Sequence, residues 1–404
     1  MRFYKKIIYV TALLMLMMSL FSFAAAADAG DAAGLIADSQ GGLVCVSHRG
    51  DVQNYPAGSL EAIRGATEKG ADAVSVPVTK TADGVFVLVE DISLGNVCNT
   101  DKASVSDITF EELEKCFLYD SFGELTVYKA VTLEKALAEL GDEVYLILDI
   151  SWEDRDGIYK LLEECDAFSR VSLRTDASAK KIAEWSDGRA DVIGIYKSNI
   201  IWSSISHINK LSEAGMMMAE YRTKNYFNVC YDKWVGNNFS ADGKARAVAA
   251  CYDTELCGKR ADSDDGWGEL IDKGFTVIET NNIEALVSYS QRLEQSRSRL
   301  AQLVEKTKNT DFSAYSQLSR ANITQSLESA EAVLSGRVKS LQATDGAYSA
   351  LTVSLADKRV ADGAEETKGA LNITGGKLVA VLAVGAVFIA SQIFVYKMHK
   401  KNKT

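Results

Sequence analysis

The chain has few of the residues that build common metal sites. It contains three histidines, His48, His207 and His399, among 404 residues. This scarcity excludes a histidine-rich metal centre. None of the seven cysteines belongs to a Cys-x-x-Cys pair, so the sequence does not indicate a zinc site. No glycine-rich phosphate loop follows any of the apolar runs described below, which disfavours a nucleotide-binding turn.

Positive charge is also scarce. The chain has 44 Lys and Arg residues against 55 Asp and Glu residues, which gives a formal net charge of −11. Nucleic-acid binding requires a basic surface that displaces counterions from the phosphates. We therefore expect no nucleic-acid partner.

The first 27 residues have the order of a secretory signal peptide. Arg2, Lys5 and Lys6 precede an apolar run over residues 7–21, and alanines at 24–27 offer a cleavage site. A first membrane helix is the alternative interpretation of this segment.

The other end of the chain predicts a membrane anchor. Residues 378–396 carry no charge, and the basic tail 397–404 follows at once. A bilayer is crossed by about 20 apolar residues, and basic flanks remain cytoplasmic. We expect a transmembrane helix at residues 377–396, a cytoplasmic tail, and an extracytoplasmic position for everything between signal peptide and anchor.

Short apolar runs alternate with helical patterns between residues 43 and 293. The runs are nearly continuous, which is typical of strands buried on both faces of a parallel sheet. The strands expected are residues 43–47, 73–78, 85–89, 144–150, 191–196, 216–221, 247–252 and 275–280. The helices expected between them are residues 59–69, 132–140, 154–165, 177–185, 205–214 and 267–273, with Ser59 and Thr132 as N-caps. Roughly eight strands alternating with helices predict a TIM-type (β/α)8 barrel over residues 40–290, with a doubly wound open sheet as the alternative.

The pattern becomes purely helical after the expected barrel. Leu286, Leu293 and Leu300 recur at every seventh position. We expect an all-helical spacer over residues 291–360, followed by a polar linker over residues 361–376.

The odd number of cysteines leaves at least one unpaired in an oxidising compartment. Disulfides between Cys98 and Cys116, and between Cys251 and Cys257, are both open possibilities.

Six segments occur in an order that resembles the glycerophosphodiester phosphodiesterase family. They are VCVSHRGD, YPAGSLEAI, GADAVSVPVTKTADGVFVLVED, TLEKALAEL, VYLILDIS and GFTVIETNNIEAL, and they extend over residues 43–290. The resemblance implies a TIM-type barrel that cleaves a glycerophosphodiester to glycerol 3-phosphate and an alcohol. It also implies two acid–base histidines and a calcium or magnesium ion that polarises the phosphate.

Part of the family pattern is kept. His48 and Arg49 match the first histidine and the arginine of its HRG motif, at the end of the first strand, where barrel active sites form. A histidine can move protons at neutral pH, and the arginine fork suits a phosphate. Asp91 matches a family aspartate and is expected to contact the ligand.

The metal-binding part of the pattern is changed. The family's E-x-D strand places two carboxylates on one face, which suits a hard cation. Those positions are Ser75 and Pro77 here. Glu90 replaces the second histidine, and a glutamate is a general acid only if burial raises its pKa. Asp149 retains one carboxylate for a metal, whereas Ser151 replaces the phosphate-binding lysine of the E-x-K strand.

These replacements predict a hydrolase-like pseudoenzyme without a cofactor, which binds a glycerophosphodiester, a lipid headgroup or a wall polymer at the cell surface. One alternative is an active phosphodiesterase that uses calcium or magnesium in a rebuilt site. That site would combine His48 as the base with Glu90, Asp149 and either Glu220 or Glu279. A structural surface spacer is the other alternative.

Overall fold

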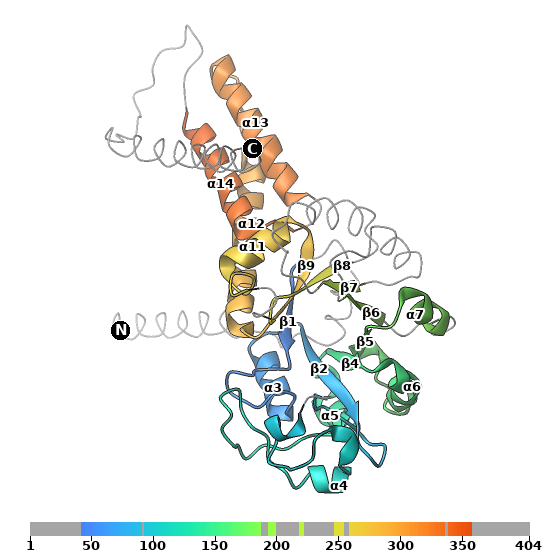
Figure 1. Ribbon diagram of the computed structural model, residues 1–404. Helices are drawn as coiled ribbons and strands as arrows, with labels where there is room; N and C mark the ends of the chain where they lie inside the picture. Colours follow the sequence, from blue (N-terminus) through green and yellow to red (C-terminus); the bar gives the residue numbers. More distant parts are fainter. Residues whose placement is uncertain are drawn as a thin grey trace, which may run out of the picture. The chain divides into compact units, whose positions relative to one another are not determined.

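The computed structural model describes residues 42–90, 93–186, 193–198, 218–221, 246–253, 258–335 and 338–357. Within them the strands form a sheet in the order β1-β9-β8-β7-β6-β5-β4-β2-β3, and β1 also pairs with β2. This additional pairing closes the sheet, and all neighbours around the closed ring are parallel. The expected barrel is therefore confirmed, and Figure 1 shows its strands with helices arranged around them.

The barrel strands are mostly those expected from the apolar runs. They are β1 Val44–His48, β2 Ala73–Lys80, β4 Leu146–Ile150, β5 Val171–Thr175, β6 Ile193–Ser198, β7 Met218–Tyr221, β8 Arg246–Ala250 and β9 Phe275–Thr280. A small apolar cluster from β1, β2, β4, β8 and β9 fills the interior. A much larger cluster lies between the strands and the surrounding helices.

The expected barrel strand at residues 85–89 is wrong. Only β3, Phe86–Val87, is extended there, and it pairs antiparallel with the end of β2. A tight turn causes this reversal, because Thr81 donates its backbone N–H to Val85 O at 2.9 Å. The apolar side chains of the run pack against the segment that follows, in a separate cluster that includes Leu94, Val105 and Leu118. The remaining barrel strand is β5, which the apolar pattern did not predict.

The helices α3 Leu60–Glu68, α5 Leu133–Leu140, α6 Arg155–Glu164, α7 Ala179–Ser186 and α11 Asp264–Asp272 follow the barrel strands in the chain. Both expected N-caps are confirmed, since Ser59 accepts from the N–H of Ala62 and Thr132 from that of Lys135. The helix expected at 205–214 lies outside the described residues. The segment between β3 and α5 contains the 3-10 turns Leu94–Asn96 and Val105–Asp107 and the one-turn helix α4, Phe110–Leu113.

Three longer helices follow β9, namely α12 Ile283–Lys308, α13 Gln317–Leu334 and α14 Leu341–Ala356. The first two leucines of the heptad pattern, Leu286 and Leu293, are buried in the large barrel cluster. The third, Leu300, packs with α13 and α14 residues such as Ala330 and Leu351. Residues 311–320 belong to a second compact unit, in which the rings of Phe312 and Tyr315 meet edge to face.

In the parts of the chain that the structure describes, no helix combines the length and apolar character needed to cross a bilayer. The signal peptide expected at residues 1–27 lies outside those parts. So do the linker at 361–376, the membrane helix at 377–396 and the tail at 397–404.

Candidate functional site

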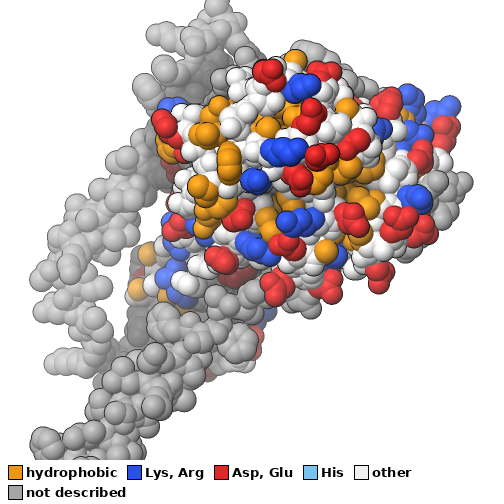
Figure 2. Space-filling model, turned by 90° about the horizontal axis from the view of Figure 1, so that it is seen from below, with side chains coloured by type: hydrophobic (Ala, Val, Ile, Leu, Met, Phe, Trp, Pro, Cys, Tyr) orange, Lys and Arg blue, Asp and Glu red, His pale blue; other side chains and the backbone are white. Residues whose placement is uncertain are grey.

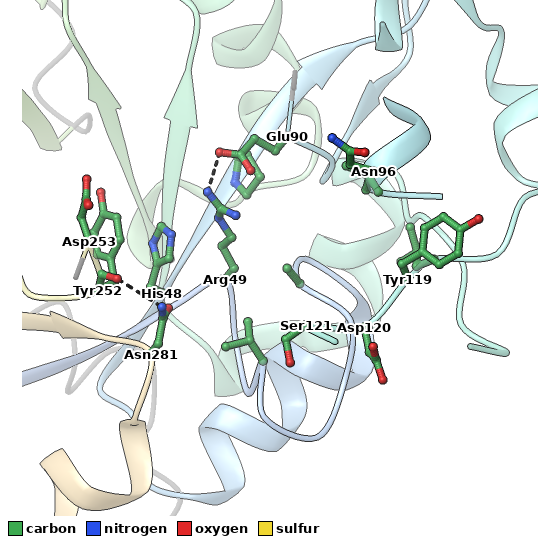
Figure 3. A pocket seen from close by; sticks show the side chains of 15 residues that line it. His48, Arg49, Glu90, Asn96, Tyr119, Asp120, Ser121, Tyr252, Asp253 and Asn281 are labelled. Atoms are coloured by element: carbon green, nitrogen blue, oxygen red, sulfur yellow. Dashed lines mark hydrogen bonds and ion pairs between the residues drawn. The ribbon is translucent and has the colours of Figure 1, made fainter. Parts of the chain in front are cut away.

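A cavity of about 440 Å³ lies at the carboxyl ends of the barrel strands. His48 and Arg49, at the end of β1, line it together with Glu90, Tyr252 and Asn281 (Figure 3). Active sites of parallel barrels form at this end, because the loops that follow the strands converge there. The structure thus brings three of the predicted site residues together in one cavity. Asp91 lies outside the described residues.

The backbone after β1 is held in an unusual conformation. Arg49 and Gly50 have φ angles of 62° and 89°. Arg49 donates its N–H to Ser75 O at 2.8 Å, and its carbonyl accepts from the N–H of Gly58 at 3.0 Å. A Cβ on residue 50 would lie 2.5 Å from the carbonyl carbon of Ala62, so only glycine fits. A left-handed arginine costs free energy, and such strain gathers at functional sites.

His48 is a neutral and well-oriented imidazole. Its Nδ1 lies 2.8 Å from Glu279 Oε1, and its ring stacks on Tyr252 with a centroid separation of 3.5 Å. Burial lowers the pKa of His48 to about 4. The positive charges of Arg49 and Arg174 also lower this pKa, whereas the hydrogen bond and the charge of Glu279 oppose the shift by raising it. An ionised carboxylate only accepts hydrogen bonds, so Nδ1 donates to Glu279 and Nε2 is the basic nitrogen.

Arg49 is paired with the residue that replaces the second family histidine. Its Nη2 donates a short hydrogen bond to Glu90 Oε1, which Figure 3 shows as a dashed line. The side chains of Arg49 and Glu90 are 30% and 31% exposed, so the pair faces the cavity rather than the core. A ligand anion of sufficient charge can therefore compete with Glu90 for the guanidinium.

The two residues at the E-x-D positions supply no carboxylate. Ser75 is fully buried, and its hydroxyl donates to Glu279 Oε1. Pro77 lines the cavity and is aligned with Asp149 on the neighbouring strand. Asp149 is 20% exposed and accepts two hydrogen bonds of 2.7 Å from Arg174.

Arg174 is the important site residue that the sequence analysis did not find. It lies on β5, the strand that the apolar pattern missed, and its side chain is fully buried. The sequence feature that could have revealed this strand is the stretch Val171–Thr175, which alternates apolar and polar residues between two helices and contains the arginine. Its carboxylate partners Glu220 and Glu279 did appear as possible members of a rebuilt cation cluster.

The described residues do not fit a divalent metal ion. No group of three or more His, Cys, Asp or Glu side chains among them has the arrangement of a metal site. The carboxylates that do converge, those of Asp149, Glu220 and Glu279, direct oxygens to Arg174. Calcium and magnesium bind such oxygens, so the guanidinium holds the atoms that either ion would need.

Comparison with known proteins points to one family. The model of the glycerophosphoryl diester phosphodiesterase family matches residues 48–213. A glycerophosphodiester phosphodiesterase of Caldanaerobacter subterraneus subsp. tengcongensis is 32% identical over 103 residues, which are 25% of this chain and 42% of the relative. Glycerophosphodiester phosphodiesterase 1 of Bos taurus is 34% identical over 70 residues, 17% of this chain and 21% of the relative. The chain thus matches less than half the length of these curated relatives.

Solved structures agree at the level of the fold. A glycerophosphoryl diester phosphodiesterase from Parabacteroides distasonis superposes with a TM-score of 0.53 at 18% identity, covering 65% of this chain and 92% of that protein. A putative glycerophosphoryl diester phosphodiesterase from Silicibacter pomeroyi gives a TM-score of 0.50 at 16% identity, covering 63% of this chain and 98% of that protein.

Proposed function

The chain carries a domain of the glycerophosphoryl diester phosphodiesterase family, and from this premise we propose that it binds a phosphate-bearing ligand without metal-dependent hydrolysis. The ligand would be a glycerophosphodiester, a lipid headgroup or a wall polymer. The observation that carries the proposal is the guanidinium of Arg49 in the cavity, held there by a left-handed backbone. An arginine fork binds phosphate oxygens in two parallel hydrogen bonds.

The family chemistry requires a cation at the phosphate. Ser75 has only a hydroxyl to offer, which already donates to Glu279, and Pro77 has no side-chain ligand. Glu90 is paired with Arg49, and His48 is the one histidine in the described lining of the cavity, so the couple of two acid–base histidines that the family resemblance implies is not present there. These features support binding as the function that has been kept.

A ligand titration tests this proposal. We expect glycerophosphocholine and glycerol 3-phosphate to bind the full-length protein in EDTA, and Arg49→Gln to weaken binding at least about tenfold. Arg64→Gln is the matched control, because Arg64 on α3 pairs with Glu139 at an exposed position. An equal loss in both variants, or an unchanged affinity of Arg49→Gln, would refute the role of Arg49.

Hydrolysis is the second candidate, and the pair formed by His48 and Glu279 favours it. With Nδ1 bound to Glu279, the Nε2 atom of His48 could take a proton from an attacking water and then return it to the oxygen of the leaving alcohol. A turnover of glycerophosphocholine that His48→Ala abolishes would establish this candidate. If the wild-type protein releases glycerol 3-phosphate no faster than His48→Ala does, the result supports the binding module.

We further propose that the protein is a single-pass membrane protein whose barrel is extracytoplasmic. The uncharged run from Leu378 to Tyr396 and the basic residues after it support this proposal. Removal of residues 378–404 should release the protein from membranes, and protease added outside intact cells should digest the barrel. Retention in the membrane after this deletion would refute the C-terminal anchor.

The face in Figure 2 mixes acidic, basic and hydrophobic side chains, so it has no continuous basic field for a nucleic acid.

The spacer alternative makes a different prediction. If the helices after β9 held the essential partner surface, a partner would be lost on substitution of an exposed residue there, such as Val353 on α14. Binding of that partner would be unchanged after substitution of Arg49.

A further inference from the structure

Side chains from distant strands meet near the carboxyl end of the barrel. Asp149 comes from β4, Glu220 from β7 and Glu279 from β9, and Glu220 and Glu279 are fully buried. Three carboxylates in a closed barrel interior repel one another and are poorly solvated, so the fold needs a cation between them.

Arg174 is that cation. Its Nε donates to Asp149 Oδ1 and its Nη2 to Asp149 Oδ2, each at 2.7 Å. Its Nη2 also donates to Glu279 Oε1 at 3.1 Å. Its Nη1 makes a short contact with Glu279 Oε2 and lies 2.5 Å from Glu220 Oε2. Every nitrogen of the guanidinium therefore contacts a carboxylate oxygen.

The cluster around Arg174 is connected to the predicted catalytic residue His48 through Glu279. Glu279 accepts from His48, from Ser75 and from Arg174 at once. Asp149 and Arg174 are directly aligned on neighbouring strands, and Pro77 is aligned with Asp149. The same carboxylate thus orients the imidazole at the cavity and binds the buried guanidinium.

We propose that the Arg174 guanidinium is the permanent cation of this barrel, which holds Asp149, Glu220 and Glu279 in the way that a divalent metal ion otherwise would. Burial alone would lower the pKa of Arg174, but the three carboxylates raise it well above its usual value, so its charge is fixed at every physiological pH. Unlike a metal, this cation cannot be exchanged or chelated. The inference stands on the buried contacts and does not depend on which ligand the cavity binds.

Removal of Arg174 tests the inference. Arg174→Ala leaves three acids with space for an ion, so the variant should gain a calcium site. In EDTA its melting temperature should fall by roughly 10 °C, because an uncompensated buried charge is strongly destabilising. Calcium chloride at millimolar concentration should raise it again by about 5 °C or more, and calorimetry should show one calcium per chain. The wild-type protein should show neither response.

Two further variants control for unspecific destabilisation. Arg170 precedes β5, is also buried, donates to the carbonyls of Leu137 and Gly141, and lies 3.3 Å from the single exposed carboxylate of Asp142 instead of a buried carboxylate cluster. Arg170→Ala should therefore lower the melting temperature without any calcium response. Arg174→Lys keeps one cation, so it should also be insensitive to calcium.

If Arg174→Ala does not fold in EDTA, its refolding from urea is compared with and without calcium, and recovery in calcium alone supports the inference. Stoichiometric calcium binding by the wild-type protein would overturn the inference. So would an Arg174→Ala variant that neither binds calcium nor folds better in its presence.

Discussion

The Nδ1 atom of His48 donates to Oε1 of Glu279 at 2.8 Å, in a barrel interior where Glu279 is fully buried. This hydrogen bond fixes the tautomer of the imidazole, while the ring of Tyr252 covers one of its faces. Because Glu279 also binds Arg174, the orientation of the cavity histidine depends on the buried guanidinium.

Acid should destabilise the protein through His48. The folded pKa of about 4 lies below the ordinary value of 6.5, so the unfolded chain binds the additional proton between these values. The free energy of unfolding should therefore fall as the pH drops from 6.5 to 4, by at most about 3 kcal/mol. Urea unfolding of His48→Gln over this range measures the contribution, since the variant should lose most of the slope. An identical slope in wild type and variant would contradict the assigned pKa.

Glu90 should act as an internal competitor of the ligand. It neutralises Arg49, and a phosphate must displace it. Glu90→Gln should therefore tighten the binding of glycerol 3-phosphate, by about threefold to tenfold, whereas Glu111→Gln, at the exposed pair with Lys115, should not. Weaker binding by Glu90→Gln in the same titration would show that Glu90 contacts the ligand directly.

Gly50 should be intolerant of a side chain. Gly50→Ala combines a φ of 89° with a Cβ placed 2.5 Å from a backbone carbon of Ala62, so it should cost about 2 kcal/mol or more. Gly346→Ala is the opposite case, because this residue is on α14 with open space around it and should gain about 0.5–1 kcal/mol. Equal unfolding midpoints for the two variants would contradict the strained turn after β1.

Cys98 and Cys116 should differ in reactivity. Both are free thiols in the structure, and burial together with the neighbouring Cys116 raises the pKa of Cys98 to about 12. The thiolate is the reactive form, so iodoacetamide at pH 8 should label Cys116 well before Cys98 in the reduced, folded protein. Mass spectrometry of tryptic peptides gives both rates, with unfolded protein as the control. Faster labelling of Cys98 would exclude the buried position that the structure assigns to it.

The sequence was sufficient to locate the barrel strands that are continuous apolar runs. Every barrel strand except β5 falls on such a run, and His48 and Arg49 lie at the end of β1, as expected. The run at residues 85–89 misled because apolar side chains bury equally well in a hairpin beside the barrel, and only the turn at Thr81 distinguishes the two cases.

The side chains that surround Arg174 in the barrel interior were harder to predict from the sequence. In β5 the polar residues Ser172 and Arg174 are buried, which breaks the apolar pattern of a barrel strand. The burial of Arg174 is favourable only because Asp149, Glu220 and Glu279 approach it from strands far along the chain. The pattern of apolar and polar residues along the chain does not show which residues from distant strands come into contact. The replacement of the E-x-D pair by Ser75 and Pro77 indicated the loss of a metal, but not what holds the remaining acids.

A calorimetric comparison shows whether the protein binds its ligand without a metal ion. The full-length protein is titrated with glycerol 3-phosphate in EDTA and again in millimolar calcium. We expect the same affinity in both buffers, because Arg49 supplies the phosphate contact and Arg174 already occupies the carboxylate cluster. Binding that appears only with calcium would contradict it.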